Sequence, residues 1–268
     1  MGLSDTLRFI LGHPMNRGRP VSTLGRFVKW QVQSLIQGEV VFDWIDGSKL
    51  AVRRGMTGAT GNIYCGLHEY VDMSFVLHTL KPGDLFVDIG ANVGSYTVLA
   101  SKVCGAETIA AEPDPYTAGY LRRNIEINGM ENTVQVVEAA FGASEGFVNF
   151  TIGLDTVNKV AKAEDHNARE VPVRTLDEVL NGQVPKVIKI DVEGYEAEVL
   201  KGAINTLAAP GLEAIITETL DDEVEVILRE AGFRRSYYDP ETRMLSSLPC
   251  AFVSHNSLML RGAPEGIQ

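Results

Sequence analysis

A glycine-rich turn between an apolar segment and a predicted helix constrains the fold of this chain more than any other feature. Residues 85–87 before the turn are apolar at consecutive positions, as expected of a parallel strand covered on both faces, and residues 96–103 after it are predicted to be helical. Gly90 and Gly94 lack Cβ, so the backbone can turn sharply and approach a ligand, while the helix start presents unpaired N–H groups. The turn therefore predicts a small-molecule site at the end of a buried strand.

The spacing of the turn indicates which ligand it binds. A dinucleotide-binding turn would read G-x-G-x-x-G, with a second glycine that makes room for the pyrophosphate. Here Asn92 replaces that glycine, and Asp88 precedes the first one. The next apolar strand, residues 107–111, is followed by Glu112, where a carboxylate can accept ribose hydroxyls. A nucleoside that carries positive charge instead of phosphate fits these acids, which predicts S-adenosylmethionine as the cofactor.

A third strand is predicted at residues 134–137, and Glu138 follows it. This position lies on the rim where the adenine of such a cofactor would rest, so Glu138 is assigned to the adenine region. An exposed acid without a ligand would look the same in the sequence.

Strand and helix patterns alternate from about residue 70 to residue 220, which is typical of a doubly wound parallel sheet. Further strands are predicted at residues 214–217, 233–238 and 257–260. We therefore predict an α/β fold with a Rossmann-like, seven-stranded, mostly parallel sheet and an antiparallel edge strand.

The chain is predicted to be one domain with an N-terminal extension, because 268 residues suffice for one sizeable core. Residues 1–56 would form the extension, a helix plus a hairpin, residues 57–262 the α/β domain, and residues 263–268 a C-terminal tail. The helix of the extension either caps the domain or pairs with another subunit, which would make a homo-oligomer.

The net charge and the cysteine content limit the kinds of binding partner and the cellular compartment that we expect. A formal net charge of -11 disfavours nucleic acid as a partner, since its binders carry basic surfaces. Cys65, Cys104 and Cys250 lack C-x-x-C spacing, so neither a disulfide framework nor a zinc site is indicated. No apolar run approaches the roughly 18 residues that span a bilayer. We expect a cytoplasmic protein with a small-molecule acceptor and without a membrane partner.

Charged residues also mark the fourth predicted strand, residues 187–190. Lys189, Asp191 and Glu193 alternate along it and emerge near its carboxyl end, where ligands bind in open α/β sheets. Such charges are costly to bury unless they are paired. A structural ion pair would explain them. The functional hypothesis instead places Asp191 at the methyl-donor site, with Lys189 or Glu193 orienting it.

Taken together, these segments resemble the FkbM-type methyltransferases of the class I S-adenosylmethionine-dependent fold. The resemblance rests on residues 86–94, 112–113, 173–177 and 189–196. Asn92 departs from the wider class, in which many members carry glycine, and this leaves the path of the turn open. The resemblance implies direct in-line O-methylation of a hydroxyl on a sugar or a polyketide-like secondary metabolite. By the same resemblance, the methionine part of the cofactor would contact Asp88, Gly90, Asn92 and Gly94, the ribose would contact Glu112, and the adenine region would contact Glu138.

Two polar segments are candidates for lids that contact the acceptor. One precedes the first core strand, and the other follows residue 154. Ordinary solvated loops would have the same composition. The residues expected to bind the acceptor are Tyr64, His68, Glu69, Thr156 and Asn158.

The chemistry requires alignment of two reactants, which supplies most of the acceleration. A base is useful as well, because an aliphatic hydroxyl is a poor nucleophile, and it adds on the order of 10² to 10⁴ in rate. Asp191 is the first candidate for this base and His68 the second, although a hydrogen-bonded lid histidine is the commoner role. A divalent metal would also acidify the hydroxyl, but no ligand spacing indicates one.

Other functions fit the sequence less well. A nucleic-acid amino-methyltransferase would carry an N/D-P-P-Y motif after the fourth strand, where this chain reads Asp191-Val192-Glu193-Gly194. A nicotinamide-dependent oxidoreductase is disfavoured by the missing middle glycine. Two alternatives stay open: a protein that binds S-adenosylmethionine without catalysis, and a methyltransferase for another small-molecule nucleophile.

Overall fold

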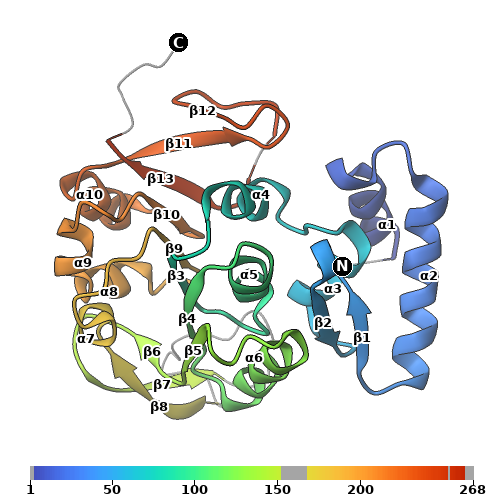
Figure 1. The fold of residues 1–268 in the computed structure, drawn as a ribbon, viewed down its shortest axis with the longest axis horizontal. Helices are drawn as coiled ribbons and strands as arrows, with labels where there is room; N and C mark the ends of the chain where they lie inside the picture. Colours follow the sequence, from blue (N-terminus) through green and yellow to red (C-terminus); the bar gives the residue numbers. More distant parts are fainter. Residues whose placement is uncertain (1–2, 152–167, 253, 263–268) are drawn as a thin grey trace.

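The computed structural model describes residues 3–151, 168–252 and 254–262. Its main body is an eight-stranded sheet with helices on both faces (Figure 1). The strands of this sheet are β3 (Leu85–Ile89), β4 (Glu107–Ala111), β5 (Val134–Val137), β9 (Val187–Ile190), β10 (Ala214–Thr217), β11 (Phe233–Asp239), β12 (Met244–Ser246) and β13 (Ser257–Arg261).

The strand order is β12-β11-β13-β10-β9-β3-β4-β5. Neighbours from β5 to β10 pair in parallel, whereas β13 runs antiparallel to both β10 and β11. The predicted mostly parallel seven-stranded sheet is confirmed, and the short antiparallel β12 adds an eighth strand at the edge. The order reverses between β3 and β9, and in open α/β sheets this is the point where ligands bind.

Helices cover the two faces of the sheet with separate apolar clusters (Figure 1). One face packs against α7 (Leu176–Leu180), α8 (Glu196–Lys201), α9 (Ile204–Ala208) and α10 (Asp222–Glu230). The other face packs against α4 (Tyr70–Thr79), α5 (Ser95–Val98), the π-helical turn Leu99–Val103 that continues α5, and α6 (Pro115–Asn128).

The ends of these helices follow local sequence signals. Asp114 caps α6 by accepting hydrogen bonds from the backbone of Tyr116 and Thr117, and Gly129 ends the helix in the left-handed region at φ +65°. Thr175 caps α7 through the Glu178 N–H at 3.2 Å, as the sequence predicts. None of the described helices is long and apolar enough to cross a bilayer.

A small three-stranded sheet lies beside the main one. Its strands are β6 (Ala140–Phe141), β7 (Gly146–Thr151) and β8 (Ala168–Arg174), in the order β6-β8-β7. Because β6 begins three residues after β5, this sheet continues the rim at which the parallel strands end. It therefore flanks the site described below.

The N-terminal residues form a lobe of their own at the right of Figure 1. The lobe contains α1 (Leu3–Gly12), α2 (Pro20–Ile36), the antiparallel hairpin of β1 (Val40–Asp43) and β2 (Lys49–Val52), and α3 (Thr57–Cys65). The hairpin is fixed to α6, because Asn124 Oδ1 accepts from Ala51 N at 2.7 Å and Asn128 Oδ1 from Lys49 N at 2.8 Å.

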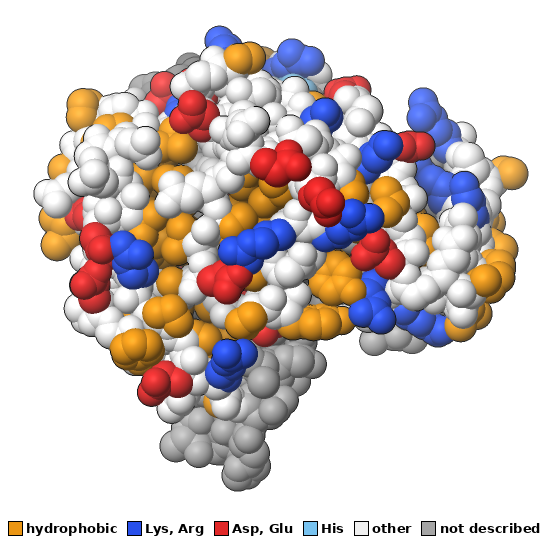
Figure 2. Space-filling view, turned by 60° about the horizontal axis from the view of Figure 1, so that its bottom comes forward, with side chains coloured by type: hydrophobic (Ala, Val, Ile, Leu, Met, Phe, Trp, Pro, Cys, Tyr) orange, Lys and Arg blue, Asp and Glu red, His pale blue; other side chains and the backbone are white. Residues whose placement is uncertain are grey.

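Helix α2 has one buried and one exposed face. Thr23 and Trp30 are buried toward the rest of the protein, whereas Val28 and Leu35 are 57% and 67% exposed on the other side. Apolar side chains accordingly line the outer edge of the lobe, where α2 lies (Figure 2).

Candidate functional site

The glycine turn after β3 lies directly against the end of β9. Gly90 has φ +77°, and a Cβ built there would lie 1.9 Å from the Asp191 carbonyl oxygen. The Gly90 N–H donates to Ala111 O at 3.0 Å, and the Asp191 N–H donates to Ile89 O at 3.0 Å. Only glycine fits this close approach. The two hydrogen bonds hold the ends of β3, β4 and β9 together.

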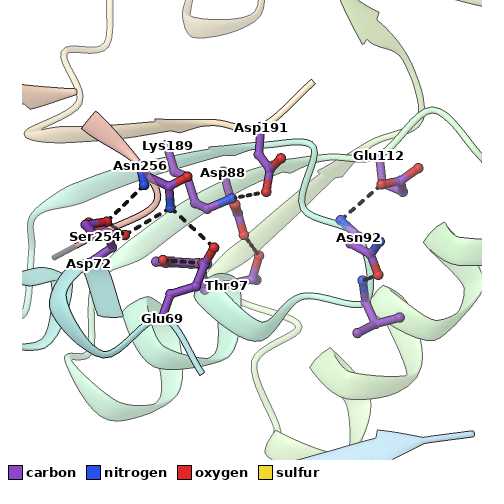
Figure 3. Close-up of polar contacts among 12 residues, drawn as sticks. Glu69, Asp72, Asp88, Asn92, Thr97, Glu112, Lys189, Asp191, Ser254 and Asn256 are labelled. Atoms are coloured by element: carbon purple, nitrogen blue, oxygen red, sulfur yellow. Dashed lines mark hydrogen bonds and ion pairs between the residues drawn. The ribbon is translucent and has the colours of Figure 1, made fainter. Parts of the chain in front are cut away.

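Asn92 takes the left-handed conformation that a glycine would adopt, with φ +51°. Asparagine adopts this region more readily than most residues, and its Oδ1 accepts from the Val93 N–H at 2.7 Å. The Asn92 N–H donates to Glu112 Oε2 at 3.0 Å (Figure 3). These bonds set the path of the turn, which the sequence left open.

Glu112 is fixed in place by backbone donors. In addition to the Asn92 N–H, it accepts from the Asp114 N–H through Oε1 at 2.9 Å. The residue is only 6% exposed, and burial raises the pKa of its carboxyl to about 7. Each carboxylate oxygen keeps a second lone pair, so Glu112 can still accept hydroxyl donors.

Lys189 is the cation at the centre of the site (Figure 3). Its Nζ donates to Asp191 Oδ2 at 2.6 Å and lies 4.7 Å from the centroid of the Tyr96 ring. Burial alone would lower the pKa of Lys189, but Asp191, Glu69 and Asp88 raise it above its ordinary value. Burial alone would likewise raise the pKa of Asp191, but Lys189 holds it below its usual range. Lys189 and Asp191 therefore form an ion pair in which the lysine is buried and the carboxylate is half-buried, with 33% of its side chain exposed.

A network of acids and amides extends from this ion pair toward α4 (Figure 3). The Tyr96 hydroxyl donates to Glu69 Oε2 at 2.6 Å. Asn256 Nδ2 donates to Asp72 Oδ2 at 3.0 Å and to Glu69 Oε1 at 3.3 Å, and the Ser254 hydroxyl also donates to Asp72. Burial raises the pKa of Asp72 to about 7.

Three further carboxyls, those of Asp88, Glu196 and Glu218, have a buried oxygen without a partner among the described residues. Asp88 accepts from the Thr97 hydroxyl at 2.7 Å through Oδ2, while its buried Oδ1 has no hydrogen-bond partner there. Glu218, which follows β10, has the same deficit at Oε2. Burial raises the pKa of Asp88. The residues around Lys189 include more carboxyl groups than cationic groups.

A cavity of about 850 Å³ lies over the carboxyl ends of the strands, and the acidic side chains that line it include Glu69, Asp88, Glu112, Asp191 and Glu218. Its floor is formed by the ends of β3, β4, β9 and β10, and the rim after β5 contributes Ala139, Ala140 and Phe141. The opposite wall comes from the N-terminal lobe. The residues of that wall include Phe9, Phe27, Trp30, Gln31, Arg54 and Tyr64.

The predicted acceptor residues that the structure describes are brought together here. Tyr64, His68 and Glu69 all line the cavity, and residues 57–65 of the expected lid form helix α3. Thr156 and Asn158, which belong to the second expected lid, lie outside the described residues. Gly94 begins α5 in the left-handed region, at φ +89°.

Two of the predicted cofactor residues, Gly94 and Glu138, are not among the residues that line the cavity. Gly94 precedes α5 as its N-cap residue, whereas Glu138 lies on the rim after β5. Glu138 pairs with Arg122 at the surface through its carboxylate. The apolar residues that follow it reach the cavity instead. The geometry gives no support to a contact between Glu138 and the cofactor.

His68 and Glu193 have unusual local environments. His68 Nδ1 is buried without a partner among the described residues, and burial lowers the pKa of the imidazole, which is therefore neutral near pH 7. Glu193 lies in the left-handed region at φ +53° although it is not glycine. Such backbone strain, of order 1–3 kcal/mol, collects at functional sites. No cluster of three His, Cys, Asp or Glu side chains suited to a metal occurs in the part of the chain that the structure describes.

Several residues of the site escaped the sequence analysis. Tyr96 falls within the predicted helix of residues 96–103, and Glu218 directly follows the predicted strand of residues 214–217, but neither pattern indicates a role in the site. Asp72 and Asn256 carry no local signal, since they are 184 positions apart and meet only in the folded chain. In the aromatic wall of the N-terminal lobe, Tyr64 is predicted from the sequence, whereas Phe9, Phe27 and Trp30 carry no local signal.

The strand order, the glycine turn at the point of reversal and the acidic cavity define a Rossmann-like protein of the class I methyltransferase type. Residues 88–235, more than half of the chain, match the family described as the methyltransferase FkbM domain. The chain belongs to this family. The match begins at Asp88, so the N-terminal lobe lies outside it.

Relatives and solved structures are similar over part of their length. A hexuronic acid methyltransferase, AglP of Haloferax volcanii, is 31% identical over 135 residues, which cover 49% of this chain and 55% of that protein. Methyltransferase sdnD of Sordaria araneosa is 25% identical over 205 residues, covering 61% of this chain and 79% of that protein. The crystal structure of methyltransferase FkbM from Methylobacillus flagellatus has a TM-score of 0.45 at 16% identity, covering 66% of this chain and 43% of that one.

Proposed function

We propose that this protein is an S-adenosylmethionine-dependent O-methyltransferase that acts on a hydroxyl of a sugar or a secondary metabolite. The observation that carries the proposal is the combination of the glycine turn with the buried carboxyls of Asp88 and Glu112 at one end of the cavity. Membership of the FkbM family supports methyl transfer.

The residues present fit the charge of the cofactor. S-adenosylmethionine has a sulfonium, an ammonium and a carboxylate, so its net charge is positive. The cavity contains more carboxyls than cations, and Asp88 Oδ1 lacks a partner among the described residues. A cationic ligand offsets this buried negative charge, whereas a pyrophosphate would add to it.

Each part of the cofactor has candidate contacts on this chain. The turn at Gly90 and Asn92, with Asp88 and Gly94 beside it, would hold the methionine part. Glu112, fixed by two backbone donors, would accept the ribose hydroxyls. In place of Glu138, the apolar segment Ala139 to Phe141 would contact the adenine, because it lines the cavity.

The acceptor would lie between the ion pair and the N-terminal lobe. Aromatic rings such as those of Trp30 and Phe27 offer flat apolar faces to a sugar or polyketide ring. Gln31 and Arg54 add polar groups to the same wall. The similarity to a hexuronic acid methyltransferase supports a sugar acceptor.

The reaction needs alignment, exclusion of water and removal of one proton. When bound, the cofactor supplies an electrophilic methyl group on its sulfonium. The Lys189 ammonium holds Asp191 in one orientation at 2.6 Å. Because this ammonium lowers the basicity of the Asp191 carboxylate, Asp191 is better suited to positioning the reactants than to removing the proton. His68 is neutral and lines the same cavity. The neutral imidazole of His68 is therefore more basic than the Asp191 carboxylate. Glu193 borders the site from a turn with a left-handed backbone conformation.

Calorimetric titration of the purified protein with S-adenosylmethionine, NAD and ATP tests the proposal. We expect selective binding of S-adenosylmethionine, its loss in Glu112→Ala, and its retention in Glu131→Ala, which removes an exposed carboxylate. No binding, or a preference for NAD, would refute the cofactor. Asp191→Asn separates enzyme from binding protein, since only an enzyme has turnover for this variant to reduce.

A further inference from the structure

Glu218 occupies a special place in the acidic site. It follows β10, beside the end of β9, and it lines the same two hollows as Asp191, so that each carboxyl affects the pKa of the other. Its Oε2 is buried and has no partner among the described residues. Glu218 borders both the main cavity and a second hollow that also contains Asp191, His68 and Glu69. The Glu218 carboxyl thus lies beside the Lys189–Asp191 ion pair, and its Oε2 atom is available to a ligand.

Two neighbouring carboxyls that line the same hollow are costly to ionise together, so the pair shares one proton. Lys189 determines where the proton lies. Because its ammonium is bonded to Asp191 Oδ2 at 2.6 Å, Asp191 takes the negative charge. The proton therefore lies on Glu218, where burial and the charge of Asp191 raise the pKa to about 8.

The surrounding charges favour this arrangement. Glu193 and Glu196 face Glu218 from the segment after β9 and add negative charge. Arg8 and Arg17 of the N-terminal lobe border the second hollow, but Lys189 is the cation bonded to the Asp191–Glu218 pair among the described residues. The remaining titratable groups around the second hollow are Asp5, His13, His68, Glu69, Tyr70, Asp72 and His255.

We propose that Glu218 exchanges the proton of the methyl-transfer site: it holds the proton in the free protein, releases it when a ligand of net positive charge enters, and then accepts the proton of the acceptor hydroxyl. This inference rests on the proposed function. In the transfer step the hydroxyl oxygen forms a bond to the methyl carbon. The carbon–sulfur bond breaks with its electron pair going to sulfur, and the hydroxyl proton moves to Glu218 Oε2.

Proton release can be measured without knowing the acceptor. Calorimetric titration at pH 7.5 in phosphate and in Tris, which differ in ionisation enthalpy, gives the number of protons released on binding. We expect S-adenosylmethionine to release most of one proton. S-adenosylhomocysteine, a neutral thioether without the sulfonium charge, should release much less.

Variants assign the proton to its residue, because Glu112 and Asp72 also have raised pKa values. Glu218→Gln should still bind S-adenosylmethionine but lose most of the release seen in the wild type. Glu230→Gln, which alters an exposed glutamate, should release as many protons as the wild type. Equal release by Glu218→Gln and the wild type would overturn the assignment.

A second measurement on the unmodified protein covers the case in which Glu218→Gln does not fold. The Kd for S-adenosylmethionine should fall by up to about tenfold per pH unit between pH 6.5 and 7.5 and level off above pH 8, because the deprotonated form binds the cation. Binding without release and with a flat pH dependence would refute the inference alone. Absence of any binding would instead refute the proposed cofactor.

Discussion

Replacing Gly90 with alanine tests whether the glycine turn must lie directly against β9. The built Cβ would be 1.9 Å from the Asp191 carbonyl oxygen, a backbone atom that cannot move alone. Gly83 is a matched control, because its φ of +89° is also positive but nothing lies within 4 Å of a Cβ there. Gly83→Ala therefore carries the conformational strain without the collision.

Both alanine variants carry the cost of the left-handed backbone, and only Gly90→Ala also carries the cost of the overlap. Alanine in the left-handed region costs roughly 1–2 kcal/mol at either position. At Gly90 the overlap adds about 1–3 kcal/mol, as for an overpacked core. It also strains the Asp191 N–H bond to Ile89 O, whose loss would cost about 1 kcal/mol. The gain from a stiffer unfolded chain is common to both variants and cancels.

Urea unfolding followed by circular dichroism gives the free energy of unfolding of each variant. We expect Gly90→Ala to be less stable than Gly83→Ala by at least about 1 kcal/mol, with unchanged m, and to lose S-adenosylmethionine binding that Gly83→Ala keeps. If both variants unfold at the same urea concentration, the close approach of the turn to β9 does not contribute as argued.

The other predictions concern the buried charges. The pKa values of Asp72 and Glu112, raised to about 7, and of Glu218, raised to about 8, all exceed those of an unfolded chain, so the native state binds more protons. The free energy of unfolding of the free protein should therefore fall as the pH rises from 6.5 to 8.5, a range above the ordinary histidine pKa. The slope is at most about 1.3 kcal/mol per pH unit for Glu218 and about 1 kcal/mol per pH unit for Asp72 and Glu112, which lose most of their protons by pH 7.5. Urea curves at three pH values check this, and a rising stability would contradict it. Lys189→Met should cost about 3–5 kcal/mol, because Asp191 loses its buried partner, whereas Lys102→Met at an exposed position should stay within about 0.5 kcal/mol. Thermal unfolding compares the two, and equal melting temperatures would show that the ion pair does not stabilise the fold.

Much of the α/β body could be predicted because its signals are local. The predicted strands at residues 134–137 and 214–217 coincide with β5 and β10. The cap residues Asp114 and Thr175 act within three positions of the backbone groups that they bind. A glycine turn and a helix cap depend on backbone geometry over a few residues, so sequence patterns report them directly.

The candidate site could be predicted only in part. The cofactor half was accessible because Asp88, Gly90 and Glu112 lie at strand ends, and parallel strands bring those ends to one edge. Glu138 shows the limit of this reasoning: its position after β5 is right for the rim, but its side chain pairs with Arg122 at the surface. The direction in which a rim side chain points depends on its neighbours in space.

The sequence by itself determined the order of strands and helices, the glycine turn and the family, because each is written in residues close along the chain. The tertiary structure decided which distant residues share the acidic site. Asp72 meets Asn256, Asp191 meets Glu218, and the N-terminal lobe closes the cavity with Trp30. The physical reason is that strand pairing and helix packing, rather than local periodicity, place residues far apart in sequence within a few ångströms of one another. The full excess of carboxyls over cations in the cavity, which would favour a cationic ligand, arises where these distant residues meet.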